Sequence, residues 1–127
     1  YKGKNILDES YKNAKNKKKE LTQNIHEVLE NFDILITPTN FDLPFNLGDI
    51  SQINKYYMRH ARSPFNVSGN PAISVPCGVS KTNLPIGFQI VGRFNADHFI
   101  SDIVHDFLIK TDWENIRKQN IVKNLFL

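Results

Sequence analysis

Residues Arg62–Arg93 read RSPFNVSGNPAISVPCGVSKTNLPIGFQIVGR and hold four of the six prolines and four of the six glycines of the chain. Between these turn-forming residues lie two short apolar runs, Ala72–Val75 and Ile86–Val91. Both runs contain β-branched residues and have the length of a strand. Pro71 and Pro76 flank the first run, and prolines are typical of the two ends of a strand. The segment therefore predicts two strands.

The loop Cys77–Pro85 joins the two runs, and its length predicts an antiparallel hairpin. Gly78 and Asn83 are residues that adopt positive φ readily, and Pro85 ends the turn just before the second strand. We expect Asp33–Ile36, another run rich in β-branched residues, to pair beside the hairpin. The side chains that we expect to be buried in the adjacent strands are Ile73, Val75, Ile86, Phe88 and Ile90.

Apolar spacing and capping residues predict helices on either side of this segment. The expected helices are Ile6–Asn31, Ser51–Arg62, Phe94–Lys110 and Trp113–Lys123. Ser51 and Asn95 are the expected N-caps. The inner face of the second helix should hold Ile53, Tyr56, Tyr57 and His60. The apolar stripe of the first helix is formed by Leu7, Tyr11, Ala14, Leu21, Ile25, Val28 and Phe32. Three strands and these helices make an incomplete α/β fold.

The motif PFNxxGxPAISVPCG followed by LPIGFQIVGR resembles the C-terminal part of the amidase signature family. The segment NFDILITPT (Asn31–Thr39) and the TDW of Thr111–Trp113 are similar to the family in the same order, so the resemblance covers roughly residues 25 to 113. It implies the C-terminal part of a mixed-sheet α/β/α domain, with residues 1–127 as a single partial domain. The first residue, Tyr1, also leads us to expect a piece of a longer chain.

The resemblance implies an enzyme that hydrolyses amide C–N bonds with a Lys–Ser–Ser triad. The Gly/Ser-rich loop that carries the nucleophile in the family is not in these residues, so no catalytic residue is assigned and the chain alone should be inactive. The expected partners are a small-molecule amide substrate and the missing N-terminal part of the domain, and a homodimer stays open. No cofactor and no metal are expected. The alternative is a non-catalytic α/β interaction module derived from such a domain.

Two segments are candidates for the substrate pocket. Thr37–Leu47 contains two prolines and follows a buried strand, and loops in that position often carry ligand contacts. The resemblance places its first residues, Thr37, Pro38, Thr39 and Asn40, beside the substrate cleft. It also places Asn66 and Gly69, in the turn Pro64–Gly69, at the border of the pocket. We expect the two segments to approach each other on one concave surface. The alternatives are a plain surface loop and a turn capped by Asn66.

Other reactive side chains point more simply to structure than to chemistry. Cys77 is a thiol that could act as a nucleophile, but a small buried residue at a strand end is the favoured interpretation. His98, Asp102 and His105 follow one another along a helix, and we interpret them as surface residues and not as a metal site. Gln89 is interpreted as a hydrogen-bonded polar group of the core. No histidine is placed by the sequence to activate Ser63, Ser68 or Ser74.

The chain carries a net charge of +3 and a pI near 9.0, largely because of the lysines in Lys12–Lys19. We interpret this run as the solvated face of a helix, because no aromatic residue stands among the lysines to stack on a base. We therefore expect no nucleic-acid partner. No membrane is expected either, since no apolar run approaches the 18 residues of a transmembrane helix. One cysteine excludes an internal disulfide and fits a reducing compartment, so the expected location is the cytoplasm.

Overall fold

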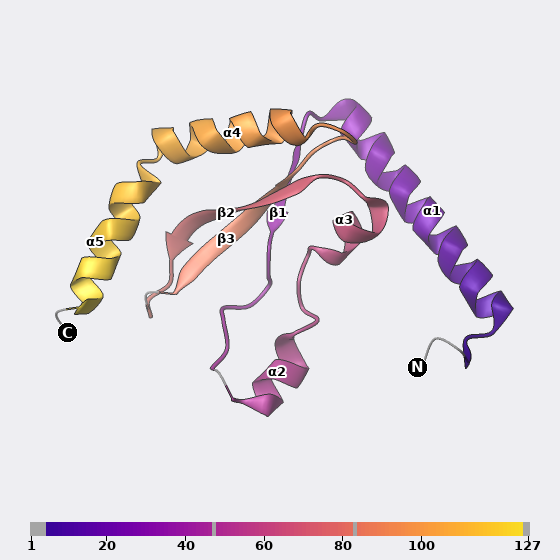
Figure 1. Ribbon diagram of the computed structural model, residues 1–127, viewed down its shortest axis with the longest axis horizontal. Helices are drawn as coiled ribbons and strands as arrows, with labels where there is room; N and C mark the ends of the chain where they lie inside the picture. Colours follow the sequence, from indigo (N-terminus) through magenta and orange to yellow (C-terminus); the bar gives the residue numbers. More distant parts are fainter. Residues whose placement is uncertain (1–4, 47, 83, 126–127) are drawn as a thin grey trace.

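A computed structural model describes residues 5–46, 48–82 and 84–125 (Figure 1). It is a mixed α/β arrangement in which a small antiparallel sheet carries helices on both faces. The elements in chain order are α1 (Asp8–Asn31), β1 (Leu35–Pro38), α2 (Ile50–Tyr56), α3 (Ser63–Ser68), β2 (Ala72–Val79), β3 (Pro85–Val91), α4 (Asp97–Lys110) and α5 (Trp113–Leu125). The predicted α/β class is therefore confirmed.

The sheet has the order β1-β3-β2, and β3 is hydrogen-bonded to an antiparallel neighbour on each side. Leu35 and Ala72 both stand opposite Val91, which fixes the register of the two outer strands. The hairpin and the third strand beside it are confirmed. β1 begins at Leu35, two residues later than the predicted Asp33, and it continues to Pro38, two residues beyond the predicted end at Ile36.

β2 is longer than the sequence predicted, because it continues through Pro76 to Val79. Its register against β3 shifts between Pro76 and Gly78, as a β-bulge does. An edge strand tolerates a proline, since the missing N–H can be one that faces away from the sheet. The predicted loop Cys77–Pro85 is therefore too long at both ends, and Gly78 lies in the strand without a positive φ. Asn83 lies outside the described residues.

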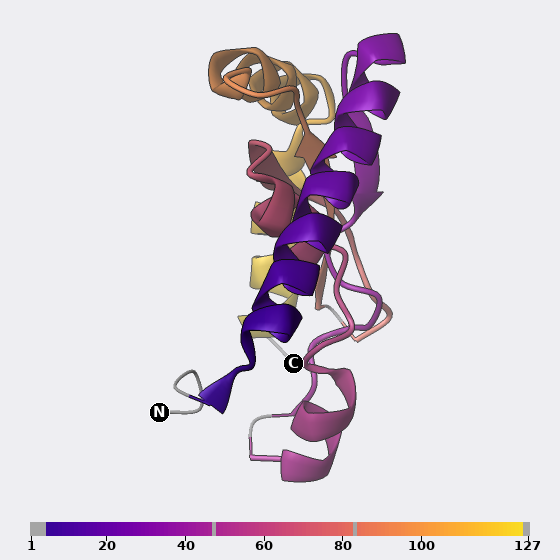
Figure 2. The same ribbon diagram turned by 90° about the vertical axis from the view of Figure 1, so that its right-hand side faces the viewer.

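Alternate residues of the strands pack against two separate hydrophobic clusters on opposite faces of the sheet. On one face, Ile90 and Val75 pack with Ile100 of α4, and the Phe88 ring meets the Phe107 ring edge-on at 5.3 Å. On the other face, Val91 packs with side chains of α1 and α3, namely Ile25, Leu29 and Phe65. In both views α2 lies at the far end of the molecule from α4 (Figures 1 and 2).

The five side chains expected in the sheet core are buried to different degrees. Val75 and Ile90 are buried, and Ile73 and Phe88 are half-buried beside them. Ile86 is 40% exposed, so the prediction is wrong for this residue. The reason is that the cluster around Ile100 reaches Phe88 but does not include Ile86, which lies at the hairpin end of the sheet.

Helix α1 packs on the sheet through its C-terminal half alone. Ile25 and Leu29 are buried, whereas all described residues from position 5 to 20 are exposed. The predicted stripe is thus correct at Leu21 and Ile25 and missed Leu29. It is wrong at its other five positions, which are exposed, namely Leu7, Tyr11, Ala14, Val28 and Phe32. In Figure 1 the N-terminal half of α1 extends away from the sheet. Packing therefore holds one end of a helix that is 24 residues long.

The chain between β1 and β2 differs most from the sequence prediction. α2 ends at Tyr56 and not near Arg62, and its N-cap is Asp49, whose Oδ1 accepts from Gln52 N at 3.0 Å. Tyr57, expected on its inner face, is exposed. A separate short helix, α3, replaces the predicted Pro64–Gly69 turn. Its start and end carry familiar signals, a proline in the first turn and Gly69 in the left-handed conformation after the last residue.

The two C-terminal helices agree with the sequence prediction apart from their ends. α4 begins at Asp97, with Ala96 and not Asn95 in the N-cap position, and Asn95 has a φ of 62°. α5 begins at Trp113 as expected and ends two residues beyond Lys123. No helix among the described residues has both the length and the hydropathy needed to cross a membrane.

The packing of α1 predicts a contrast between two neighbouring residues. Leu29→Ala should lower the free energy of unfolding by about 2–5 kcal/mol, because it leaves a cavity in a closed cluster. Val28→Ala is the matched control, since Val28 is 43% exposed, and it should change that free energy by less than about 0.5 kcal/mol. Urea unfolding followed by circular dichroism measures both. Equal losses would show that α1 does not pack through the Leu29 face.

Candidate functional site

The side chain of Gln89 links three segments at the centre of the sheet. It is 3% exposed, and its Nε2 donates to Thr37 Oγ1 at 2.8 Å and to Ala61 O at 3.0 Å, with a longer contact of 3.4 Å to Pro38 O. Thr37 and Pro38 belong to β1, whereas Ala61 precedes α3. The interpretation of Gln89 as a hydrogen-bonded core group is confirmed, but its role in joining β1 to Ala61 was not visible in the sequence.

Beyond Gln89, two hydroxyl groups meet above a glycine. Thr39 Oγ1 lies 3.0 Å from Ser74 Oγ, and Thr39 N donates to Gly87 O at 3.4 Å. Gly87 stands between them, and a Cβ on it would lie 3.5 Å from Ser74 Oγ and 3.2 Å from Val75 O. The absence of a side chain at Gly87 therefore lets β1, β2 and β3 converge closely at this end of the sheet.

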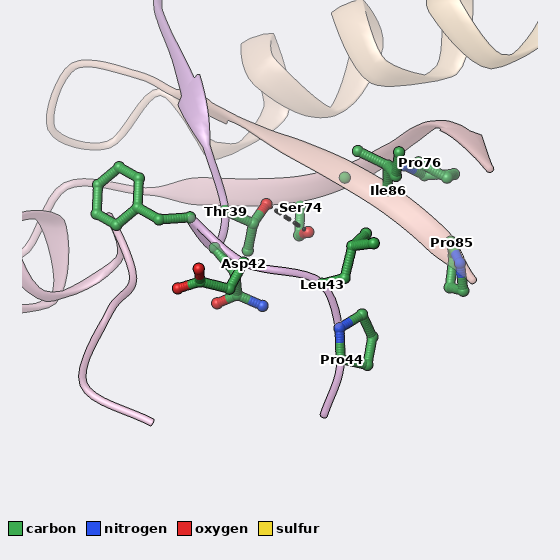
Figure 3. A pocket seen from close by; sticks show the side chains of 11 residues that line it. Thr39, Asp42, Leu43, Pro44, Ser74, Pro76, Pro85 and Ile86 are labelled. Atoms are coloured by element: carbon green, nitrogen blue, oxygen red, sulfur yellow. Dashed lines mark hydrogen bonds between the residues drawn. The ribbon is translucent and has the colours of Figure 1, made fainter. Parts of the chain in front are cut away.

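A concave surface of about 480 Å³ opens from this pair of hydroxyls (Figure 3). This volume lies in the range of small-molecule sites, about 300–1,000 Å³. Its polar groups come from Thr39, Asn40, Asp42 and Ser74. The rest of the wall is formed by Phe41, Leu43, Pro44, Pro76, Pro85, Ile86 and Gly87. A mostly apolar wall with a few convergent polar groups is the usual composition of a ligand site.

The loop that forms one side of this cavity is tied to the chain before α3. Asn40 and His60 form an isolated antiparallel bridge, and Phe41 N donates to Arg59 O at 3.2 Å. Arg59 Nε lies 2.8 Å from Asp42 Oδ2 and forms a close ion pair with it. The two groups are not aligned as a hydrogen bond requires. Because Arg59 is half exposed, this pair adds little stability and mainly fixes the direction of the Asp42 side chain.

The structure separates the predicted pocket residues into two groups. Thr39 and Asn40 line the cavity, whereas Thr37 and Pro38 lie in β1 behind it. The prediction of irregular structure from Thr37 is therefore wrong at its first two positions. Residues from position 39 to 46 form no helix and no strand apart from the bridge at Asn40, and Leu47 lies outside the described residues.

Asn66 and Gly69 are not among the residues that line this cavity. Asn66 is exposed on α3, and its backbone N–H donates to Arg62 O, so the alternative of an Asn66-capped turn is wrong. The next residue after Gly69, Asn70, donates to Gly92 O at 2.9 Å, at the opposite end of β3 from Gly87. The prediction of one shared concave surface is therefore wrong, because α3 carries the chain away from Thr39. A role of Asn66 and Gly69 in substrate binding stays a prediction.

The other candidate residues are placed as follows. Cys77 is exposed on β2, where its Sγ lies 3.6 Å from Ile86 O, so the expected burial is wrong. The prediction failed because the strand continues past Pro76. Ser68 is buried and donates to Asn70 Oδ1 at 2.6 Å. The helical residues interpreted as surface groups are indeed exposed, namely His98, Asp102 and His105. No group of three or more described residues has a geometry suited to a metal ion.

Comparison with known proteins gives a consistent result. A family model described as Amidase matches residues 2–100. The A subunit of the glutamyl-tRNA(Gln) amidotransferase of Dehalococcoides mccartyi is 40% identical over 95 residues, which cover 73% of this chain and 19% of that protein. The crystal structure of the corresponding protein of Thermotoga maritima superposes with a TM-score of 0.63 and 38% identity, over 68% of this chain and 19% of that chain.

A second solved structure is a hydrolase. The structure of 6-aminohexanoate cyclic dimer hydrolase superposes with a TM-score of 0.63 and 25% identity, over 74% of this chain and 23% of that chain. This chain therefore spans about a fifth of the length of the relatives it matches. The shared part includes the sheet and the cavity at its hairpin end, since the family match runs through β1, β2 and β3.

The Gln89 contacts predict a specific loss on substitution. Gln89→Leu keeps a similar volume but removes the donor to Thr37 and Ala61, so two partly buried acceptors lose their partner. This should lower the free energy of unfolding by about 1–3 kcal/mol. Gln23→Leu, on the exposed face of α1, is the control and should have little effect. A Gln89→Leu variant as stable as the wild type would contradict the role of this amide.

Proposed function

The chain belongs to the amidase family, and we propose that it forms the C-terminal part of an enzyme that cleaves amide C–N bonds. The observation that carries this proposal is the cavity beside Thr39 and Ser74, which combines hydroxyl groups with an apolar wall. In this proposal the cavity is one wall of the substrate site. The remainder of the domain, which the relatives have and which these residues do not cover, closes it from the other side.

The groups around the cavity suit the recognition of a neutral amide. An amide offers one carbonyl acceptor and N–H donors, and Thr39, Asn40 and Ser74 supply both kinds of partner. Apolar side chains such as Leu43 and Ile86 exclude water, which strengthens the polar contacts made inside the site. In the proposal these groups orient the substrate, and the residues Thr37 and Pro38 hold the Thr39 segment in place from β1.

The nucleophile in this proposal lies outside the chain. The family uses a Lys–Ser–Ser triad, in which a serine attacks the amide carbonyl after it has lost its proton to a base. Ser74 lines the cavity, and its hydroxyl is hydrogen-bonded to the hydroxyl of Thr39. A neutral hydroxyl is too weak a base to activate a serine. Ser74 therefore acts as a wall residue, and the catalytic serine and lysine belong to the rest of the domain.

A second candidate function is amide transfer in place of hydrolysis. It is favoured by the relatives of 40% and 38% identity, which are subunits of an amidotransferase. Both functions break the same C–N bond and differ in what receives the nitrogen. The full-length protein would then release ammonia from glutamine, and it would need partner subunits to deliver the nitrogen to an acceptor.

The isolated chain is predicted to be inactive. The purified 127-residue chain should release no ammonia from aliphatic amides, aryl amides or glutamine, because its described residues provide no activated nucleophile in the cavity. The full-length protein should release ammonia from at least one of these compounds, and a preference for glutamine would favour the second candidate function. Turnover by the isolated chain that disappears in Ser74→Ala or Cys77→Ala would overturn the proposed division of roles.

The wall of the cavity can be tested in the full-length protein. Ile86→Asp places a charge in the apolar wall and should raise KM for the amide by about 10-fold or more. Val79→Asp is the matched control, since Val79 is 37% exposed on the neighbouring strand and does not line the cavity. It should change KM by less than about twofold. If both variants have the same KM, the substrate does not contact this wall.

A further inference from the structure

A second concave surface lies on α1, far from the proposed substrate site. Its volume is about 500 Å³, and its lining residues from α1 are Lys15, Lys18, Lys19, Thr22, Gln23 and His26. Residues three, four, seven and eight positions apart share one face of a helix, so these side chains form a continuous strip. The other wall is Phe94, which follows β3. We call this surface the lysine groove.

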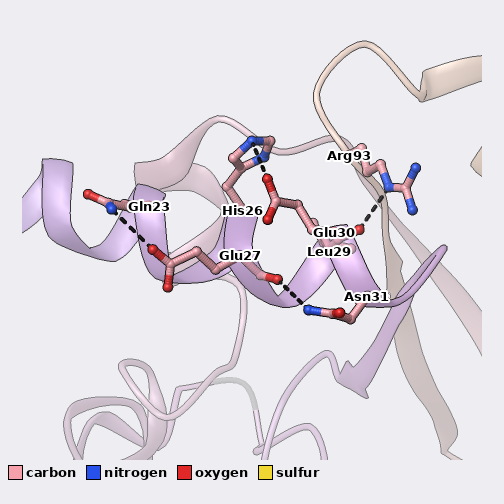
Figure 4. A network of polar contacts seen from close by, with 7 residues as sticks. All are labelled: Gln23, His26, Glu27, Leu29, Glu30, Asn31 and Arg93. Atoms are coloured by element: carbon pink, nitrogen blue, oxygen red, sulfur yellow. Dashed lines mark hydrogen bonds and ion pairs between the residues drawn. The ribbon is translucent and has the colours of Figure 1, made fainter.

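Phe94 is held in the lysine groove by contacts on both sides. Its neighbour Arg93 donates from Nε to Leu29 O at 2.8 Å, which ties this loop to α1 (Figure 4). The Phe94 ring lies against Gly69, where a Cβ would be 3.7 Å from the ring edge. The ring centroids of Phe94 and His26 are 6.4 Å apart with an angle of 38° between the planes. Phe94 nevertheless keeps 42% of its surface exposed, so a ring is available to a ligand.

This arrangement changes the interpretation of the lysine run. The sequence alone offers no reason to expect a nucleic-acid partner, because no aromatic residue stands among the lysines. The fold brings Phe94 into the groove from a distant part of the chain, beyond the end of β3. We propose that the lysine groove binds single-stranded nucleic acid, with the lysine ammonium groups on the phosphates and a base stacked on Phe94. Proteins that bind single strands without sequence preference combine these two features.

The distribution of charge favours this occupant. At one end of the groove Gln23 donates to Glu27 at 3.0 Å, and His26 lies 3.7 Å from Glu30, so the neighbouring carboxylates lie at this end (Figure 4). The positive charge is therefore concentrated at the other end, around Lys15–Lys19. An acidic protein segment would use the lysines but would gain little from an exposed ring. The proposal does not depend on the amidase function.

The test is binding of a fluorescein-labelled 12-nucleotide oligouridine, measured by fluorescence anisotropy between 50 and 300 mM salt. Three lysines on phosphates should contribute a slope of about −2 to the plot of log K against log salt. The triple variant Lys15→Gln, Lys18→Gln, Lys19→Gln should bind at least about 10-fold more weakly and lose this slope. Phe94→Ala should weaken binding by about 10-fold and keep the slope, because stacking is insensitive to salt.

A charge-matched triple variant elsewhere, Lys55→Gln, Lys81→Gln, Lys110→Gln, is the control and should bind like the wild type. Circular dichroism establishes that each variant is folded. Equal weakening by the two triple variants would overturn the proposal in favour of net charge alone. Unchanged binding by Phe94→Ala would overturn it by removing the stacking contact. If uridine monophosphate or a polyglutamate peptide binds as tightly as the oligomer, the proposal of a single-stranded nucleic acid is overturned, and the groove binds anions in general.

Discussion

The backbone of β3 is paired on both of its edges, and the buried amide of Gln89 extends this pairing to a third segment. A polar group this deeply buried has to be hydrogen-bonded, so the carbonyl of Ala61 and the hydroxyl of Thr37 are held at fixed places beside the strand. The bridge between Asn40 and His60 continues from this point. The shape of the cavity therefore depends on one side chain that lies behind its wall.

The two ends of the sheet differ, since one end is closed by a hydrophobic cluster and the other is open as a cavity. At the Val91 end, α1 and α3 close a hydrophobic cluster, and this cluster anchors the C-terminal half of α1, whose described N-terminal half is exposed. At the Gly87 end, the strands converge on the hydroxyls of Thr39 and Ser74 and leave a cavity. The hydrophobic cluster and the proposed ligand site thus lie at opposite ends of β3. This chain spans about a fifth of the length of its relatives. A cavity that is open in this part agrees with the proposal that the rest of the protein closes the substrate site.

Much of the fold could be predicted from local patterns. The β-branched runs predicted the hairpin and the third strand, and the apolar spacing predicted α1 and α4 within a few residues. α3 was missed because its six residues are too few to show a helical stripe, although Pro64 and Gly69 carry the start and stop signals. The extension of β2 past Pro76 depends on its position at the edge of the sheet, which no local pattern reveals. For the same reason the exposure of Cys77 could not be foreseen.

The candidate site was predicted in part, for a related physical reason. The loop after β1 was identified from its prolines and its position, and Thr39 and Asn40 do line the cavity. Its partners Ser74, Gly87 and Arg59 come from elsewhere in the chain, and a linear pattern does not show which residues meet. The proximity of Phe94 to the lysines of α1 is likewise a product of the fold.

The most direct measurement is a crystal structure of the full-length protein with a non-hydrolysable amide bound. The account predicts that the amide contacts the wall formed by Thr39, Asn40 and Ile86, with the catalytic serine approaching it from the remainder of the domain. It would be contradicted by a structure in which another segment of the protein fills this cavity and the amide binds elsewhere.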